Sequence, residues 1–340
     1  MQAISRLLAS PRGRYFCANL GHRCGVEAPV AHLAWPRSPR DALDVLGRVD
    51  AREIAALPEA ALLDSVAAAV DFARYWQPPD EEDLLFARPD VIELLRPIAA
   101  AVVASPHSGW WDAPVDLGDQ RAVEAFHPDH GWADRPPLRR RAADDLDRWR
   151  DRALDWEARF RDSLAADPDS GAGGEWWSTP EPSGTVSTTR ARPGLGALEL
   201  LLEEDSWGHD RARVRPVRVD GAPRVYEIRG PADWAHLVAA YPLAVPASRR
   251  AVWYDTTGEY RDWVIPDWVA VAADHDAVHL TVTGYLTTPG VAITLPSGAG
   301  ATVLAGWDPN ATFWLRDDAL TVVDEPVEWH VSPDCGWVRA

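Results

Sequence analysis

The densest group of possible metal ligands is Asp274-His275-Asp276-Ala277-Val278-His279, where a short helix is expected to give way to an apolar strand. On an extended chain, residues four positions apart lie on one face, so His275 and His279 could bind one metal ion while Asp274 or Asp276 supplies oxygen. Alternatively, His275 and the aspartates form an exposed turn, and His279 is a hydrogen-bonded sheet residue. The spacing implies no further ligand. We therefore predict no metal and keep His275, His279 and Asp276 as the candidates.

A second set of possible ligands comes from the two ends of the chain. It consists of Cys17, His22, Cys24, His330 and Cys335. Such residues suit zinc, but structural zinc sites present pairs of close ligands, and the chain has no C-x2-C pair. Cysteines without an activating partner behave as small apolar residues, so buried free thiols are the favoured interpretation.

Two groups of side chains could bind a ligand. Arg211, Arg213 and Arg215 alternate along one expected strand, and arginine binds phosphate or carboxylate through parallel N–H bonds. The favoured alternative is neutralisation by neighbouring acids, for which Glu203, Glu204 and Asp205 are the expected partners. Most of the 18 tryptophans are expected to pack in the core. Trp176 and Trp253 occur in polar, turn-rich segments and are candidates for ligand contact.

Several reaction classes are excluded because the chain contains no lysine, all 34 of its Lys and Arg residues being arginine. A pyridoxal-phosphate enzyme needs a lysine Schiff base, and a P-loop ATPase needs a lysine at the phosphates. The sequence also lacks G-x-S-x-G, G-x-G-x-x-G and H-E-x-x-H. The cofactor, if there is one, is unknown.

One resemblance points to a transferase. Ser187-Thr188-Thr189-Arg190 closes an expected strand, and Glu325 and Glu328 follow late in the chain. This layout resembles that of the ADP-ribosyltransferases, although the two acids are spaced E-P-V-E where the family has E-x-E. The resemblance implies that Arg190 holds the phosphates of NAD and that a glutamate, Glu325 or Glu328, assists the transfer.

Charge and composition limit the partners and the location. The formal net charge is −18, which argues against generic nucleic-acid binding, because such proteins usually carry a basic face. No apolar run is long enough for a signal peptide or a membrane span, and three cysteines suit a reducing compartment. We expect a cytoplasmic protein that binds no membrane and whose partner is a small molecule or another protein.

The pattern of apolar residues changes along the chain. Helical spacing dominates from about residue 40 to 166, and the Pro-, Ser- and Gly-containing segment 167–174 reads as a linker. Short strand-like runs follow, with two helices that open at Pro231 and Pro266. The expected strands are 185–189, 197–202, 211–219, 224–228, 278–286, 291–295, 301–304 and 312–315.

This pattern predicts an α+β fold, with a helical N-terminal half and a mixed, mainly antiparallel sheet domain with short helices. The predicted division is a helical region (1–166), a linker (167–174) and a Trp-rich α+β domain (175–340). Without a catalytic signature, the favoured function is a ligand- or protein-binding protein. The alternative is a nucleotide-using transferase of the ADP-ribosyltransferase kind, with its site in the C-terminal half. Whether the chain is an enzyme stays open.

Overall fold

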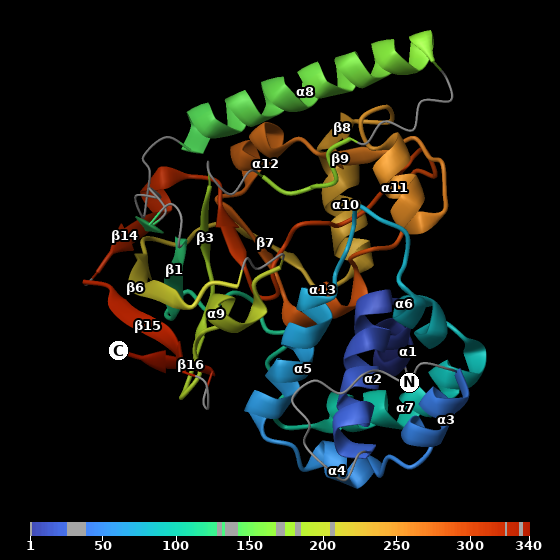
Figure 1. Cartoon of the computed structure of the whole chain (residues 1–340). Coiled ribbons are helices and arrows are strands. Elements are labelled where there is room, and N and C mark those ends of the chain that lie inside the picture. The colour runs from blue at the N-terminus through green and yellow to red at the C-terminus, as the bar shows by residue number, and fades with distance from the viewer. Residues whose placement is uncertain are drawn as a thin grey trace.

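The molecule has two lobes, as Figure 1 shows. Its structure, a computed structural model, describes residues 2–25, 39–127, 131–132, 142–167, 174–180, 185–204, 208–323, 325–332 and 336–340. The first seven helices form a helical lobe on one side, and the strands with the later helices form a sheet lobe. The predicted α+β class is confirmed.

The helices of the helical lobe begin where the sequence supplies start signals. Asp50 accepts the backbone N–H of Arg52 at 2.8 Å and caps α4, and a proline opens α7. The lobe packs around α2, whose Phe16 and Leu20 are fully buried. The helices are α1 (Gln2–Ala9), α2 (Pro11–Gly25), α3 (Pro39–Leu46), α4 (Ala51–Ala55), α5 (Glu59–Asp71), α6 (Glu81–Phe86) and α7 (Pro89–Ala104).

The larger sheet is antiparallel, in the order β16-β15-β6-β1-β2, and β14 pairs with the far end of β6. Strand β1 lies in the region that the sequence pattern marks as helical. That part of the prediction is wrong, because β6 supplies backbone hydrogen-bond partners along most of β1. The strands are β1 (Gln120–His127), β2 (Gly131–Trp132), β6 (Arg211–Val219), β14 (Leu320–Val322), β15 (Val327–Ser332) and β16 (Gly336–Arg339).

The second sheet has the order β3-β13-β10-β7, in which only β10 and β7 run parallel. The predicted strand 278–286 is too long. The Thr281 hydroxyl accepts the N–H of Gly284 at 2.9 Å and starts helix α13 at that point. The strands are β3 (Val186–Thr188), β7 (Val225–Ile228), β10 (Ala277–Leu280) and β13 (Thr312–Trp314).

Short helices and two-stranded pairs complete the sheet lobe. The predicted strand 197–202 is largely a helical turn, α9 (Glu199–Leu202), because the N–H of Leu202 binds the carbonyl of Leu198. The other helices are α10 (Pro231–Ala240), α11 (Arg250–Thr257), α12 (Trp268–Asp274), α13 (Val282–Thr287) and the 3-10 helix η1 (Asp317–Ala319). The strand pairs are β4 (Ala191–Arg192) with β5 (Gly196–Ala197), β8 (Pro242–Ala244) with β9 (Val264–Pro266), and β11 (Ile293–Thr294) with β12 (Ala301–Thr302).

Helix α8 (Ala142–Ala166) lies along the outside of the sheet lobe and packs on α12 (Figure 1). Its buried residues form one stripe at helical spacing, namely Ala142, Leu146, Trp149, Ala153 and Glu157. The stripe ends at Glu157, so the last turns of the helix are held by fewer buried contacts than the first.

One hydrophobic core joins the two lobes. It contains Leu7 and Phe16 of the helical lobe together with Trp253 and Tyr285 of the sheet lobe. The division into domains at residues 167–174 stays a prediction. Residues 168–173 of that linker lie outside the described residues, and both β1 and α8, which precede it, pack on C-terminal elements.

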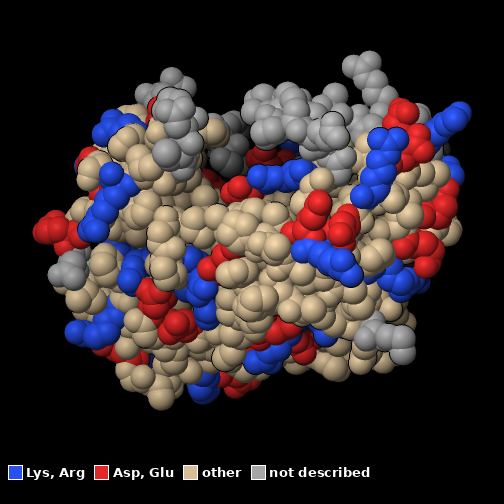
Figure 2. All heavy atoms as spheres, turned by 90° about the horizontal axis from the view of Figure 1, so that it is seen from below, with Lys and Arg blue, Asp and Glu red and all other residues tan. Residues whose placement is uncertain are grey.

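The surface carries both signs of charge. On the face shown in Figure 2, acidic and basic side chains are interspersed, without a large area of either sign. Within the described ranges, no helix combines the length and the apolar character that crossing a membrane requires.

Candidate functional site

A pocket of about 290 Å³ lies at the junction of the two lobes. The start of α2, the segment around Tyr75 and helix α6 form one wall, and the end of α11 with residues 290–292 forms the other. Its charged lining consists of Arg12, Arg14, Arg74, Asp83 and Glu259. We call it the interlobe pocket.

The start of α2 is fixed by a close approach of three helices. A Cβ atom on Gly13 would lie 1.9 Å from the carbonyl oxygen of Leu7 and 2.8 Å from that of Leu286, so only glycine fits there. Pro11 suits the first turn, where its missing N–H has no helical partner. This packing holds Arg12 and Arg14 at the pocket wall.

Arg12 is neutralised within the wall. Its side chain is almost fully buried, and Nη2 lies 2.7 Å from both carboxylate oxygens of Asp83, while Nη1 donates to the carbonyl of Ala69. Burial lowers the pKa of Arg12, but Asp83 and nearby tyrosines outweigh it and the pKa is raised. Burial raises the pKa of Asp83 against the opposing effect of Arg12. The pair ties α2 to α6.

Arg14 and Arg74 differ from Arg12, because their hydrogen-bond partners are carbonyl oxygens. Nη1 of Arg14 donates to the carbonyls of Leu8 at 3.1 Å and Ala9 at 2.8 Å. Nη1 of Arg74 donates to two carbonyls of its own loop at 2.6 and 2.7 Å. Burial lowers the pKa of Arg14, and only the more distant Asp83 opposes this. Among the described residues, neither guanidinium forms an ion pair with a carboxylate.

An ionisable cluster lies behind the pocket wall. The hydroxyl of Tyr75 lies 3.5 Å from that of Tyr285, and Tyr285 donates to Oε1 of Glu204 at 2.8 Å. The backbone N–H of Glu204 donates to Oδ1 of Asp308 at 2.6 Å. Burial raises the pKa of Glu204 to about 8, and the charge of Asp308 adds to the rise. Glu204 is therefore mostly protonated at neutral pH, which is unusual for a carboxylic acid and typical of functional sites.

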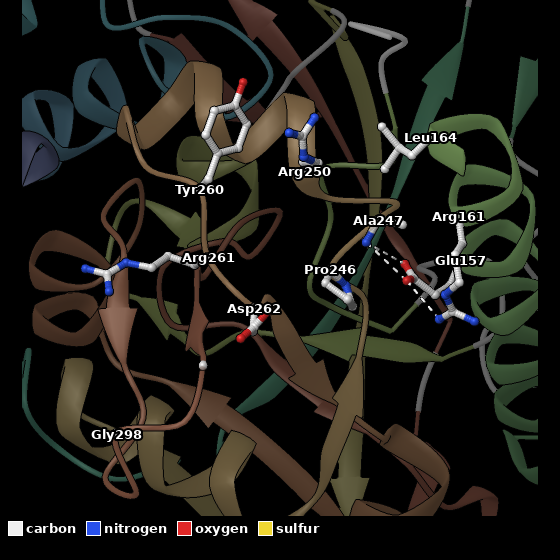
Figure 3. Close-up of a pocket in the computed structure, with 11 residues that line it drawn as sticks. Glu157, Arg161, Leu164, Pro246, Ala247, Arg250, Tyr260, Arg261, Asp262 and Gly298 are labelled. Atoms are coloured by element: carbon white, nitrogen blue, oxygen red, sulfur yellow. Dashed lines mark hydrogen bonds and ion pairs between the residues drawn. The ribbon is translucent and has the colours of Figure 1, made fainter. Parts of the chain in front are cut away.

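A second, larger pocket of about 630 Å³ opens between α8 and the loop after α11 (Figure 3). The carboxylate of Glu157 crosses from α8 and accepts the N–H groups of Ala247 and Ser248 at 2.8 to 3.1 Å. Arg161 binds the same carboxylate at 3.2 Å, and Arg261 binds Glu259 at 2.6 Å. Arg250 of the same lining lies 4.5 Å from the ring centroid of Tyr260 and has no carboxylate partner among the described residues. Because Glu157 joins α8 to the backbone of residues 247 and 248, we interpret this pocket mainly as the contact that docks α8.

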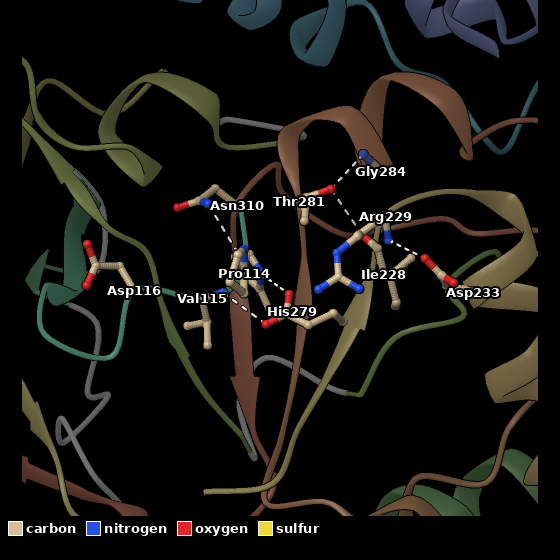
Figure 4. Close-up of polar contacts among 12 residues, drawn as sticks. Pro114, Val115, Asp116, Ile228, Arg229, Asp233, His279, Thr281, Gly284 and Asn310 are labelled. Atoms are coloured by element: carbon tan, nitrogen blue, oxygen red, sulfur yellow. Dashed lines mark hydrogen bonds and ion pairs between the residues drawn. The ribbon is translucent and has the colours of Figure 1, made fainter. Parts of the chain in front are cut away.

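The structure places His279 in a closed network at the ends of β7 and β10 (Figure 4). Nδ1 lies 2.7 Å from a Glu227 oxygen, and the amide nitrogen of Asn310 lies 3.1 Å from Nε2. The other Glu227 oxygen accepts the N–H of Val115. An amide nitrogen can only donate, so Nε2 is the acceptor and Nδ1 carries the proton. Both ring nitrogens are occupied, and neither is available to a metal.

The remaining residues of the histidine segment lie apart from His279. His275 places its ring edge-on to those of Tyr226 and Tyr241, and Asp276 accepts the backbone N–H of Arg224 at 2.7 Å. Burial lowers the pKa of His275. The described part of the chain contains no group of three or more His, Cys, Asp or Glu residues arranged to hold a metal ion.

Of the three candidate arginines of β6, Arg213 and Arg215 are paired with acids other than the expected ones, and Arg211 contacts aromatic rings. Arg213 binds Glu328 of β15 at 3.1 Å and lies 3.8 Å from the ring centroid of Trp132. Arg215 binds Glu124 of β1 at 3.6 Å, and Arg211 stacks on aromatic rings. The expected partners lie elsewhere: Glu204 faces Tyr285, Glu203 lies 4.0 Å from His209, and Asp205 is outside the described residues.

The transferase candidates do not meet in one place. Arg190 donates to the carbonyl of Pro114 at 3.1 Å and lies 5.2 Å from the ring centroid of Trp110. Burial lowers its pKa. Glu328 is bound to Arg213, and Glu325 is exposed. Among the described residues, no contact joins Arg190 to either glutamate.

The two tryptophan candidates are joined by a hydrogen bond, from Nε1 of Trp253 to the carbonyl of Trp176 at 3.0 Å. Trp253 is fully buried in the core, so its ring faces no solvent. Trp176 is partly buried and packs on Trp76 and Trp177, and Trp177 is exposed.

The cysteines and histidines of the chain ends also stay separate where they are described. Cys17 and Cys24 are free thiols on α2, and burial raises the pKa of each. Burial lowers the pKa of the nearby His22. His330 lies on β15, and Cys335 is outside the described residues.

Sequence reasoning missed the residues of the interlobe pocket. The signal that could have found part of it is Pro11-Arg12-Gly13-Arg14, two arginines on either side of a glycine at a helix start. Nothing in the sequence links this segment to Arg74 or Glu204, which only the fold brings near. Comparison with known proteins adds no further candidate, because no protein family, curated protein or solved structure matches this chain.

Proposed function

We propose that the protein binds a small anionic molecule in the interlobe pocket. The observation that supports this is the pair of arginines, Arg14 and Arg74, that line one pocket with carbonyl oxygens but no carboxylate as partners. In a chain with 52 acidic residues, uncompensated arginines facing the same pocket call for a ligand.

The charges around the pocket support the same proposal. Asp83 is bound to Arg12, and Glu259 is bound to Arg261 at 2.6 Å. What remains is the positive charge of Arg14 and Arg74. Arg14 is partly buried, which costs free energy that an anionic partner offsets, whereas Arg74 is exposed. Both guanidinium groups can bind phosphate or carboxylate through parallel N–H bonds. The carbonyl oxygens on Nη1 hold both side chains in place, so little side-chain entropy is lost on binding.

The first test is a thermal-shift screen of the protein with sulfate, phosphate, citrate and phosphate esters. We expect at least one of these anions to raise the melting temperature, because a ligand that binds only the folded state stabilises it. Arg14→Gln and Arg74→Gln should each weaken binding by roughly 10- to 100-fold, the worth of a charge-assisted hydrogen bond of ~1.5–3 kcal/mol.

The matched control is Arg96→Gln, which removes an exposed arginine paired with Glu93 on α7. It should leave anion binding unchanged. The proposal fails if no anion stabilises the protein, or if Arg96→Gln weakens binding as much as the two pocket variants do.

The same pocket favours a small molecule over a protein as the partner, because its volume suits a compact ligand. A cytoplasmic location is part of the proposal, supported by the two free thiols on α2. We do not extend the proposal to ADP-ribosyl transfer, since Arg190 and Glu328 have separate partners and Glu325 is exposed.

A further inference from the structure

The ionisable cluster is connected to the interlobe pocket through two tyrosines. Tyr75 is one of the residues that line the pocket, and its hydroxyl lies 3.5 Å from that of Tyr285, which donates to Glu204. Arg12 is a second connection between the pocket and the ionisable cluster, because it lines the pocket and interacts electrostatically with Glu204. Glu204 is thus buried, and Tyr75 and Tyr285 lie between it and the pocket surface that a ligand would touch.

The pocket has the charge for a doubly negative head group. Arg14 and Arg74 each use Nη1 for carbonyl oxygens, and no partner is recorded for either Nη2 within the described residues. Two guanidinium groups without carboxylate partners match two negative charges on one ligand. Phosphate and sulfate groups carry that charge on a compact set of oxygens, which guanidinium forks recognise.

An ionised Glu204 would oppose such a ligand. The groups that face it are Arg12 from α2, Tyr75 after α5, Tyr285 from α13 and Asp308 from the turn before β13. Arg12 is the only cation among these described neighbours, and Asp83 already binds it. An ionised Glu204 would therefore have no cation that is not already paired with another carboxylate. Its negative charge would make the electrostatic potential at the pocket more negative.

Resting on the proposed function, we propose that the ligand of the interlobe pocket is a dianion of the phosphate or sulfate type, and that it binds tightly only while Glu204 carries its proton. The proton and the ligand then favour each other. Because linkage is reciprocal, binding of the dianion strengthens the hold of Glu204 on its proton and draws a proton from solution wherever Glu204 is partly ionised.

Other groups near the pocket do not titrate in the same range. Burial raises the pKa of Tyr75 and of Tyr285 well above the usual value, so both stay neutral up to about pH 9. No histidine or cysteine lines the pocket in the described chain. A change in affinity between about pH 7 and about pH 9 therefore reports on Glu204, whose pKa is about 8.

The test is isothermal titration with sulfate, which stays a dianion throughout this range. We expect the wild type to bind sulfate roughly tenfold more weakly at about pH 9 than at about pH 7, because the fraction of molecules in which Glu204, with a pKa of about 8, is protonated falls by about that factor. Glu204→Gln should bind with nearly equal affinity at both pH values. The control Glu203→Gln, which removes the neighbouring carboxylate, should keep the pH dependence of the wild type.

The inference is overturned if the sulfate affinities of the wild type and of Glu204→Gln fall equally between about pH 7 and about pH 9. It is also overturned if the affinity of the wild type does not change with pH. If Glu204→Gln does not fold, the pH dependence of sulfate binding by the wild type tests the inference by itself. Titration at about pH 8 in buffers of different ionisation enthalpy should show proton uptake on binding, and its absence rejects the inference. Sulfate that fails to bind at any pH contradicts the proposed function itself, so the two failures are distinct.

Two further arms identify the ligand class. Acetate, a monoanion, should bind more weakly than sulfate at about pH 7, and equal binding would reject the dianion assignment. Inorganic phosphate and phosphoserine carry the same head group from two sources. Tighter binding of phosphoserine would identify a phosphate ester as the ligand, and tighter binding of phosphate the free ion; both support the assignment.

Discussion

Arg14 shows how a single residue can indicate a function through the partners it lacks. It is half-buried, its Nη1 is held by two carbonyl oxygens, and its Nε is buried without a partner in the described structure. In the same pocket wall Arg12 binds Asp83, whereas Arg190 elsewhere in the chain resembles Arg14, because it donates to a carbonyl oxygen and its Nε is also buried without a partner. The proposed anion would give Arg14 a charged partner in place of the carbonyl oxygens alone.

Glu204 leads to a prediction about stability. The folded state keeps a proton on Glu204 up to about pH 8, whereas the unfolded chain releases it near the ordinary value of 4.5. Between these two values the folded state binds more protons, so the free energy of unfolding falls as pH rises, by up to about 1.4 kcal/mol per pH unit from this one group. The Glu204→Gln variant lacks this titrating group, so its free energy of unfolding should depend less on pH between about 5 and 8 than that of the wild type.

Urea unfolding of wild type and Glu204→Gln at several pH values measures this difference directly. Glu203→Gln is again the matched control, since it removes a neighbouring carboxylate and leaves the buried one. Equal slopes of stability against pH for wild type and Glu204→Gln would show that Glu204 is ionised in the folded protein near neutral pH.

Among the elements, α8 depends on one buried carboxylate for the attachment of its later turns. Glu157 accepts N–H groups from Ala247 and Ser248, and the buried stripe of the helix ends there. Glu157→Gln keeps the shape but loses the charge, so we expect a loss of ~1–3 kcal/mol of stability and faster amide exchange in residues 158–166.

Arg161→Gln is the control for this variant, because Arg161 is mostly exposed and its ion pair with Glu157 contributes little. It should leave both stability and exchange close to the wild type. If the two variants have the same effect, Glu157 does not hold the helix in the way that its hydrogen bonds indicate.

The helices and strands that could be predicted are those whose sequence pattern lies within a few adjacent residues. Strand β6 matches the predicted strand 211–219, and Asp50 caps α4, because an alternating pattern and a cap each depend on a few adjacent residues. Strand β1 was missed because its partner β6 lies far along the chain. The strand predicted at 278–286 was too long because apolar periodicity over so few residues does not separate a strand from a buried helix such as α13.

At the scale of the whole molecule, the candidate site exists only because the two lobes meet. Arg14 comes from α2, Arg74 from the segment after α5, and Glu204 from the chain after α9, and one core joins these parts. Distant residues that meet at a junction leave no spacing in the sequence, and so Arg14, Arg74 and Glu204 could not be predicted as a group. His279 stood out in the sequence instead, although its ring nitrogens are both occupied.

The measurement that tests the central claim most directly is isothermal titration of sulfate into wild type and into Arg14→Gln/Arg74→Gln at about pH 7. The wild type should bind one sulfate per chain, and the double variant, with its melting temperature checked in parallel, should show no measurable binding. Equal binding by both proteins would contradict the assignment of the interlobe pocket as an anion site.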